Sequence, residues 1–306
     1  MHDIIIVGGG PAGLTAALYA LRAGKRVLVI EKGGFGGQMT YSPKIENYPG
    51  FPSISGSELA DKMVDQVLAQ GADVAVETVT AVVPNADGTK TVTTDAGSYT
   101  AGAVILATGA KHRLLGVPNE TKFVGDGISF CAVCDGAFYE GKDVIVVGGG
   151  NSALQEALLL AETSKSVTVV QNLDFFTGEQ KLVDLLTSKT NVTVRFGCTV
   201  KEFVGDDTLG GMIVADTHTG DEKTLFADGV FVAIGLAPEN EAFADVVLLE
   251  DGYIVGADDC GTTAEGIFTA GDCRLKAVRQ VATAVSDGAI AALSACAYLD
   301  RLHAHA

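Results

Sequence analysis

One short unit occurs twice in the chain, with 140 residues between matching positions. In the first copy, a β-branched run at residues 3–7 leads into the turn 8–13 (Gly-Gly-Gly-Pro-Ala-Gly), an apolar helix pattern and a second strand. In the second copy, residues 143–147 lead into the turn 148–153 (Gly-Gly-Gly-Asn-Ser-Ala), followed again by a helix pattern and a strand. A strand, a glycine turn, a helix and a second strand are typical of a dinucleotide-binding βαβ unit. The repeat therefore predicts an α/β fold with two Rossmann-like domains.

Each glycine of the first turn meets a physical demand of dinucleotide binding. Gly8 forms the tight turn, Gly10 lets the backbone approach a pyrophosphate, and Gly13 lets the helix pack closely on the strand. The pyrophosphate then binds the unpaired N–H groups at the start of the helix. Glu31 ends the next strand, 18 residues after Gly13, where a carboxylate can accept hydrogen bonds from ribose hydroxyls. The first copy therefore predicts a dinucleotide site.

The second copy lacks the groups that would bind the sugar of a nicotinamide nucleotide. Gln171 stands where the ribose-binding acid is expected, and no Lys or Arg occurs between Lys165 and Lys181. The same stretch contains the acids Asp174 and Glu179. A 2′-phosphate dianion is normally held by charge-assisted pairs with arginine. The second copy therefore favours neither NADPH nor NADH.

A Cys-x-x-Cys pair, Cys131 and Cys134, lies between the two glycine turns. This spacing has two common meanings, half of a zinc site or a redox dithiol. None of the five His residues is spaced with a Cys as a ligand pair, and no second Cys-x-x-Cys occurs, so a dithiol is favoured. One thiolate can then attack a disulfide while the other resolves the mixed disulfide. Asp135 follows directly and suits a general acid–base role, although an aspartate here is also common at a turn or helix start.

The charge balance restricts the partners of the protein. The chain has 38 acidic and 21 basic side chains, a formal charge of −17, which repels nucleic acid and anionic lipid. Residues 4–21 carry no charge, but the glycines and proline in their middle would break a membrane-spanning helix. The first residues have no cationic flank of the kind found in signal peptides. We expect a cytoplasmic protein that binds neither nucleic acid nor membrane.

With these motifs in hand, the chain resembles the low-molecular-weight thioredoxin reductases over nearly its whole length. Further similar segments are 36–40, 46–52, 107–110, 131–136, 269–272 and 279–284. The resemblance implies two Rossmann-like domains of the three-layer β-β-α type, the second inserted in the first. A FAD-binding domain would comprise 1–113 and 240–306, and a pyridine-nucleotide-like domain, 114–239, would carry the dithiol. The hinge would lie near 111–117 and 236–240.

The same resemblance implies the role of each site residue. Cys134 would face the flavin, Cys131 would attack the substrate disulfide, and Asp135 would serve as the acid–base residue. A thioredoxin-like protein would be the substrate, and the enzyme would be a homodimer. The residues implied to bind FAD are Gly8, Gly10, Pro11, Ala12, Gly13, Glu31, Lys32, Gly37, Gln38, Asn47, Thr108, Gly109, Gly271, Asp272, Arg279, Gln280 and Val281.

The chain departs from the family pattern at 171–177, where typical members have a His-Arg-Arg run and a further Arg. Branches without a pyridine nucleotide include flavin thioredoxin reductases that take electrons from reduced ferredoxin, and this chain looks more like those. Acidic ferredoxins would need a local basic patch, for which the candidates are Lys111, His112, Arg113, Lys276 and Arg279. The alternatives are an NADPH-dependent reductase that holds the phosphate through Lys165 or Lys181, a dithiol oxidase that uses oxygen, and a flavin-bound redox sensor.

Overall fold

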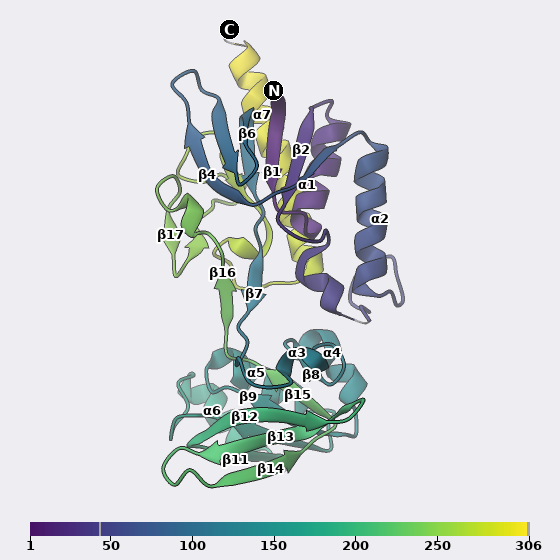
Figure 1. Cartoon of the computed structure of the whole chain (residues 1–306), viewed down its shortest axis with the longest axis vertical. Coiled ribbons are helices and arrows are strands. Elements are labelled where there is room, and N and C mark those ends of the chain that lie inside the picture. Colours follow the sequence, from purple (N-terminus) through teal and green to yellow (C-terminus); the bar gives the residue numbers. More distant parts are fainter. Residues whose placement is uncertain (43, 305–306) are drawn as a thin grey trace. The chain divides into compact units, whose positions relative to one another are not determined.

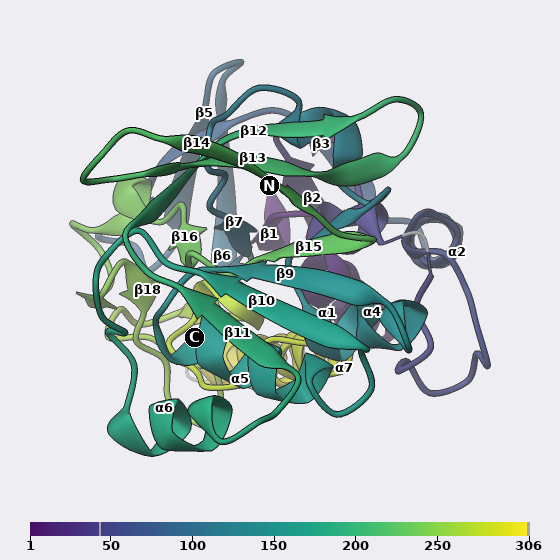
Figure 2. The ribbon, with the colours of Figure 1, turned by 90° about the horizontal axis from the view of Figure 1, so that it is seen from below.

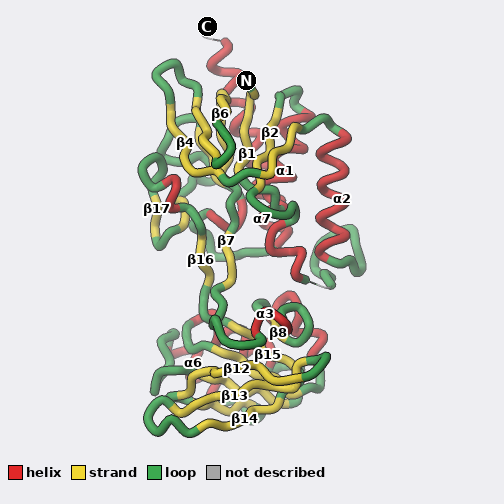
Figure 3. Tube along the Cα trace, in the orientation of Figure 1, coloured by secondary structure: helices red, strands yellow, loops and turns green. Residues whose placement is uncertain are grey.

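The computed structural model describes residues 1–42 and 44–304 and divides the chain into two compact units. Unit 1 combines Met1–Lys111 with the described chain from Ala237 onward, and unit 2 is His112–Leu236 (Figure 1). The strands β7 (Ala110–His112) and β16 (Leu236–Pro238) pair with each other where the chain passes from one unit to the other (Figure 3). The α/β class with two Rossmann-like domains is therefore confirmed.

Unit 1 is built on a seven-stranded sheet in the order β3-β2-β1-β6-β5-β4, with β19 also paired to β6. Its strands are β1 (His2–Val7), β2 (Val27–Glu31), β3 (Asp73–Val76), β4 (Val79–Pro84), β5 (Lys90–Thr94), β6 (Ser98–Leu106) and β19 (Ile267–Thr269). Along β1, Ile4 and Ile6 face one core and Ile5 and Val7 face the other. All four side chains are buried, as expected of a parallel strand that is covered on both faces.

Helices cover one face of this sheet, and Val67 of α2 (Gly56–Ala69) also lies in the core on that face. Helix α1 (Pro11–Arg22) and the long α7 (Val281–Ala304) pack against each other in the same core as Ile4 and Ile6. Residues 281–302 of α7 are long and apolar enough to cross a membrane, but Ala291, Ala292 and Ala295 are fully buried inside unit 1. Residues 4–21, which also lack charge, form most of β1, the glycine turn and α1.

Unit 2 has three layers (Figure 2). Its parallel sheet runs β11 (Val192–Arg195), β10 (Ser166–Val170), β9 (Asp143–Val147), β15 (Gly229–Val232), β8 (Ile128–Ser129). One face is covered by the antiparallel strands β12 (Cys198–Gly205), β13 (Leu209–Asp216) and β14 (Glu222–Phe226), and the other by α5 (Asn151–Leu160) and α6 (Gln180–Thr187). The short α4 (Ala132–Asp135) and η2 (Gly136–Tyr139) pack on α5.

The repeat seen in the sequence recurs in the backbone hydrogen bonds. The N–H of Gly8 donates to Ile30 O at 2.8 Å, and that of Gly148 donates to Val170 O at 2.9 Å. These bonds attach each glycine turn to the end of the second strand of its own unit.

The remaining elements connect these layers. They are η1 (Gly37–Tyr41), α2 (Gly56–Ala69), α3 (Glu120–Phe123), η3 (Glu241–Phe243), β17 (Leu249–Glu250), β18 (Tyr253–Ile254) and η4 (Gly271–Cys273).

Candidate active site

The first glycine turn forms an open cradle between β1 and α1. Gly8 has φ +110, and a Cβ there would lie 2.2 Å from the carbonyl oxygen of Ala107. A Cβ on Gly13 would lie 1.9 Å from Gly8 O, so this residue must be glycine for α1 to pack on β1. Gly10 differs, because the nearest atom to its added Cβ is Gly37 Cα, 4.0 Å away. The backbone at Gly10 is therefore open to a ligand, next to the first turn of α1, whose N–H groups have no side-chain cap.

Glu31 is held in place by the backbone around it. Its Oε2 accepts a hydrogen bond from Gly9 N at 2.6 Å, and its Oε1 accepts one from Gly33 N at 2.9 Å. The carboxylate therefore stands at the end of β2 beside the glycine turn, the position that a ribose requires. The neighbouring Lys32 forms an ion pair with Glu239.

The other cofactor residues predicted from the sequence lie at the ends of neighbouring elements of unit 1. Thr108 and Gly109 follow β6, Gly271 and Asp272 follow β19, and Val281 begins α7. Because β1, β2, β6 and β19 are parallel neighbours, their carboxyl ends meet at one edge of the sheet. Three side-chain contacts involve members of the predicted set: Thr108 Oγ1 donates to Asn240 Oδ1 (2.7 Å), Asn47 Nδ2 donates to Gln280 Oε1 (3.1 Å), and Arg279 lies over the Tyr253 ring (4.2 Å to the centroid). Gly37 and Gln38 lie in η1 (Gly37–Tyr41).

Asp272 carries a carboxylate oxygen that lacks a hydrogen bond. Its Oδ1 is buried and accepts none from the part of the chain that the structure describes, although Lys276 Nζ lies 3.4 Å away. Burial raises the pKa of this carboxyl, and Lys276 opposes the shift. A buried acceptor of this kind calls for a donor. The hydroxyl groups of FAD supply such donors, so Asp272, Glu31 and the open turn at Gly10 fit this cofactor.

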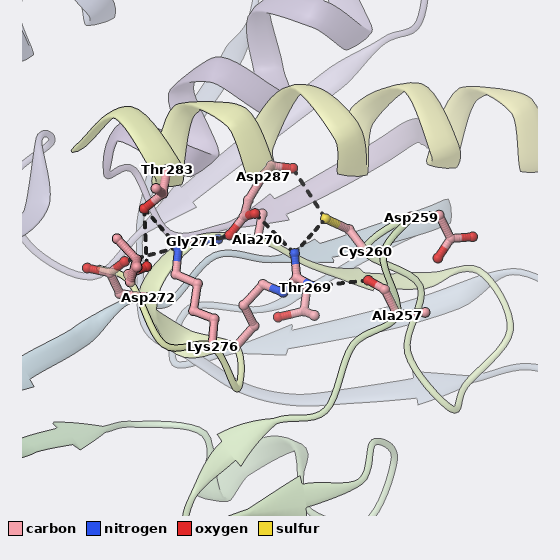
Figure 4. Close-up of polar contacts among 12 residues, drawn as sticks. Ala257, Asp259, Cys260, Thr269, Ala270, Gly271, Asp272, Lys276, Thr283 and Asp287 are labelled. Carbon is pink, nitrogen blue, oxygen red and sulfur yellow. Dashed lines mark hydrogen bonds and ion pairs between the residues drawn. The ribbon is translucent and has the colours of Figure 1, made fainter. Parts of the chain in front are cut away.

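A buried charge cluster ties the Asp272 loop to α7 (Figure 4). Asp287 Oδ2 accepts hydrogen bonds from Gly271 N (3.1 Å) and Lys276 Nζ (3.0 Å), while its Oδ1 accepts one from Arg274 Nη1 (3.0 Å). The side chains of Asp287, Arg274 and Lys276 are only 12–14% exposed. Asp287 was not among the residues predicted from the sequence, and its signal is that it is the one charged residue in the stretch 281–299 of α7.

The two cysteines predicted as a redox pair are joined by a disulfide in unit 2. Cys131 caps the start of α4, and its Sγ accepts a hydrogen bond from Cys134 N at 3.2 Å. Val133, between them, is 62% exposed, so the disulfide lies at an accessible turn. Within residues 1–42 and 44–304, no group of three or more His, Cys, Asp or Glu is placed to hold a metal ion.

Asp135 lies beside the disulfide with one oxygen bound and one free. Its Oδ2 accepts a hydrogen bond from Ser129 Oγ at 2.6 Å, and the same hydroxyl oxygen accepts one from Cys131 N at 3.1 Å. Its Oδ1 is buried without a hydrogen bond from any described residue. Burial raises the pKa of Asp135, and the Ser129 hydrogen bond opposes the shift. Ser129, which sequence analysis did not single out, therefore links the acid to the disulfide.

The second glycine turn is closed by its own loop. A Cβ on Gly149 would lie 2.4 Å from the side-chain amide of Gln171, so this side chain covers the turn. The Gln171 amide is itself engaged, since Nε2 donates to Phe175 O and Oε1 accepts from Asn172 N, both at 3.2 Å. Thr177 N donates to Gly149 O at 2.9 Å. The loop therefore presents no cation where a 2′-phosphate would bind.

Two of the cations near this loop have other partners and a third lies on another strand, whereas Lys181 is exposed on α6 directly after the loop. Lys165 pairs with Asp143 (2.7 Å) at the opposite end of β10, and His218 pairs with Asp174 (2.9 Å), which raises the pKa of His218. Arg195, which sequence analysis did not consider, stands beside Val170 in the register of β10 and β11.

The basic patch suggested by the sequence is not formed from freely available cations. Burial lowers the pKa of His112 to about 4, so this ring is neutral, and it stacks on Phe130 with 4.8 Å between centroids. Lys111 pairs with Glu239, and Lys276 is buried against Asp287. Arg113 Nε donates to Leu236 O (3.4 Å), and Arg279 lies over Tyr253.

The predicted site residues separate by unit. Every predicted FAD residue lies in unit 1, whereas Cys131, Cys134 and Asp135 lie in unit 2.

Known proteins resemble the chain over almost its full length. Residues 2–288 match the pyridine nucleotide-disulphide oxidoreductase family. The chain is 42% identical to a thioredoxin reductase of Treponema pallidum, covering 98% of both proteins, and 42% identical to that of Bacillus subtilis, covering 99% of this chain and 96% of the relative. The solved thioredoxin reductase of Streptococcus pyogenes has a TM-score of 0.94 and 41% identity over 98% of this chain and 99% of its own. The chain therefore belongs to the low-molecular-weight thioredoxin reductase family and is an FAD-containing flavoprotein disulfide oxidoreductase.

Proposed function

We propose that this protein reduces the disulfide of a thioredoxin-like protein and that its FAD receives electrons from a donor other than NADPH, with reduced ferredoxin favoured. The choice of donor rests on one observation. The loop that follows β10 contains no Lys or Arg, and the amide of Gln171 is engaged within the loop. Asp174 and Glu179 add negative charge to the same loop. A 2′-phosphate brought there would lose its hydration without gaining a charge-assisted pair.

The predicted cofactor residues of unit 1 would each contribute one contact to FAD. The N–H groups at the start of α1 would bind the pyrophosphate, Glu31 would accept from the ribose, and Asp272 would accept from the ribityl chain. Bound FAD supplies a two-electron carrier that can reduce a disulfide. The open space at Gly10 and the unsatisfied Oδ1 of Asp272 support this assignment.

The predicted dithiol residues of unit 2 would carry the exchange with the substrate. Cys131 would attack the substrate disulfide as a thiolate, and Cys134 would then resolve the mixed disulfide by attacking Cys131 Sγ. Asp135 would give a proton to the departing thiolate, a role supported by its burial and its link to Cys131 through Ser129. Assigning Cys134 as the flavin-facing sulfur follows the family resemblance.

The donor is tested by mixing the oxidised protein anaerobically with NADPH, with NADH, and with chemically reduced ferredoxin, while the flavin absorbance is followed. We expect rapid bleaching by ferredoxin and none by either nucleotide at micromolar concentration. Rapid bleaching by NADPH alone would contradict the proposal. Reduction of oxidised thioredoxin by the ferredoxin-reduced enzyme, and its loss in Cys131→Ser, tests the substrate.

One observation favours an NADPH-dependent reductase as the second candidate. The Nε of Arg195 is buried and has no hydrogen-bond partner among the described residues, and this strand end adjoins the loop after β10. If Arg195 held the 2′-phosphate, NADPH would bleach the flavin of the wild type, and Arg195→Gln would raise the NADPH concentration required by about tenfold or more. Bleaching by NADH would change little.

The family resemblance also supports a cytoplasmic homodimer. Light scattering during size-exclusion chromatography is expected to give twice the chain mass. A single-chain mass at micromolar concentration would contradict this part of the proposal.

A further inference from the structure

Glu156 has a buried carboxylate oxygen, and the mechanism proposed above gives this residue no role. It lies on α5 on the same face as Ala153 and Leu160, which are fully buried. Its Oε2 is buried and has no hydrogen-bond partner in the described chain, 1–42 and 44–304. Leaving an ionised carboxylate in this state costs free energy, so the site favours a protonated carboxyl.

This face of α5 lies against the redox centre. Helix α4, which contains Cys134 and ends at Asp135, packs on α5, as does η2. A Cβ on Gly136, the residue after Asp135, would lie 3.4 Å from Leu160 Cδ2, one turn beyond Glu156. Asp135 also has a buried oxygen without a hydrogen bond, so two buried carboxyls with unsatisfied oxygens lie on facing elements beside the disulfide.

The other elements packed on α5 do not neutralise Glu156. Tyr139 of η2 has a pKa raised by burial, so its hydroxyl is uncharged. Asp143 of β9 pairs with Lys165, and β10 contributes no ionisable side chain. The charged residues of α6, Lys181 and Asp184, are exposed.

Asp135 is the neighbour that acts on Glu156 electrostatically. Burial first, and then the charge of Asp135, raise the pKa of Glu156 to about 8. Two carboxyls that share a buried site do not both ionise, so one keeps a proton.

We propose that Glu156 and Asp135 form a two-carboxyl proton relay beside the Cys131–Cys134 pair, in which Glu156 stores the proton that Asp135 delivers to the departing thiolate. This inference deepens the proposed function and rests on it. Glu156 acts through Asp135 and is therefore a positioning and proton-storing residue.

The relay balances the exchange reaction. The Cys131 thiolate attacks one substrate sulfur, the substrate S–S bond breaks, and the departing thiolate takes a proton from Asp135. Asp135 then takes the proton of the Cys134 thiol, whose thiolate attacks Cys131 Sγ, and passes it to the second departing thiolate. Two electrons and two protons reach the substrate, one proton from Cys134 and one from the carboxyl pair. The Glu156 proton reaches Asp135 as the first thiolate departs, and the carboxyl pair regains one proton from solvent after the exchange.

The test uses the holoenzyme, reduced with dithiothreitol and freed of excess reductant, so no electron donor or thioredoxin is needed. Reoxidation is followed with two disulfides over a range of pH. An alkyl disulfide such as cystine releases a basic thiolate that needs a proton, whereas 5,5′-dithiobis(2-nitrobenzoate) releases an acidic aryl thiolate that does not. We expect Glu156→Gln to slow the alkyl reaction about tenfold near pH 8 and to move its alkaline limb to lower pH. The aryl reaction should be unchanged.

The matched control is Glu162→Gln, an exposed glutamate paired with Lys189, which should leave both reactions at the wild-type rate. Equal slowing of both reactions by Glu156→Gln, or identical pH profiles, would overturn the relay. Infrared difference spectra of wild type minus Glu156→Gln provide a measurement independent of kinetics. They should contain a protonated-carboxyl band at neutral pH that disappears in alkali, and its absence at neutral pH would also overturn the relay. A wild type inert to both disulfides would instead contradict the proposed function.

Discussion

At the scale of single residues, the first glycine turn contains two glycines required for different reasons. Gly13 is required by packing, since its added Cβ would lie 1.9 Å from a carbonyl oxygen, whereas Gly10 faces open space with ordinary extended backbone. We expect Gly13→Ala to destabilise the apoprotein by about 3 kcal/mol or more, because the start of α1 must move away from the backbone at Gly8. Gly10→Ala should keep the apoprotein Tm and weaken FAD binding. Calorimetry and flavin titration measure the two effects, and equal losses of Tm would contradict the distinction.

The pKa of Glu156 predicts a pH dependence of stability. The folded value of about 8 lies above the ordinary 4.5, so the native state binds more protons than the unfolded state between these values. Stability therefore falls as pH rises through this window. Glu156→Gln cannot lose a proton, and we expect its Tm to decline less than that of the wild type between about pH 5 and pH 9. Parallel declines in the two proteins would show that Glu156 does not titrate in this range.

At the scale of elements, the loop after β10 is expected to determine nucleotide use. The absence of Lys and Arg from this loop was evident in the sequence. The structure shows in addition that the Gln171 side chain covers Gly149. We expect the triple substitution Asn172→Arg, Leu173→Arg and Thr177→Arg, which restores the arginines of the family pattern, to confer flavin bleaching by NADPH but not by NADH. The same three positions changed to Gln form the matched control. If the arginine variant folds but its flavin is not bleached by NADPH, then the closed loop, rather than the missing charge, excludes the nucleotide.

The charge cluster of Asp287, Arg274 and Lys276 holds the loop that contains Asp272 against α7. Asp287→Asn would leave Arg274 largely buried with a neutral partner and Lys276 with only the Asp272 carboxylate, 3.4 Å away. We expect a loss of about 3–5 kcal/mol in stability together with weaker FAD binding. Asp300→Asn is the control, because Asp300 is 65% exposed in its pair with Lys25 and should cost at most about 1 kcal/mol. Chemical denaturation of the apoproteins measures both, and similar losses would contradict the structural role of Asp287.

Local sequence explains why some of these features could be predicted and others could not. The glycine turns, Glu31 and the Cys-x-x-Cys pair are short patterns whose chemistry depends on neighbours in the chain. Glu156, by contrast, gains its importance from the packing of α4 and η2 on α5. Arg195 meets the loop after β10 because of the register of two strands separated by a helix. Such contacts depend on tertiary packing, which leaves no periodic signal in the sequence.

At the scale of the whole molecule, the repeated βαβ unit predicted two domains, and the predicted FAD residues lie in one unit while the cysteine pair lies in the other. Unit 2 is a continuous segment with its own buried cores on both faces of its sheet. Unit 1 is discontinuous, but the pairing of β7 with β16 brings its two ends together. A short linker from Lys111 to Ala237 can therefore replace unit 2 at little cost in loop entropy.

This arrangement predicts that each unit functions alone. All predicted FAD residues lie in unit 1, so the linked variant should bind FAD with an affinity within about tenfold of the full chain and show a flavin spectrum. The separate segment 112–236 should fold and, once its disulfide is reduced, should react with 5,5′-dithiobis(2-nitrobenzoate) without flavin. Neither piece alone should carry out the whole reaction, in which the donor bleaches the flavin and the enzyme then reduces thioredoxin. If the linked unit 1 folds by circular dichroism but does not bind FAD, the cofactor site must include residues of unit 2, and the division of chemistry between the units is wrong.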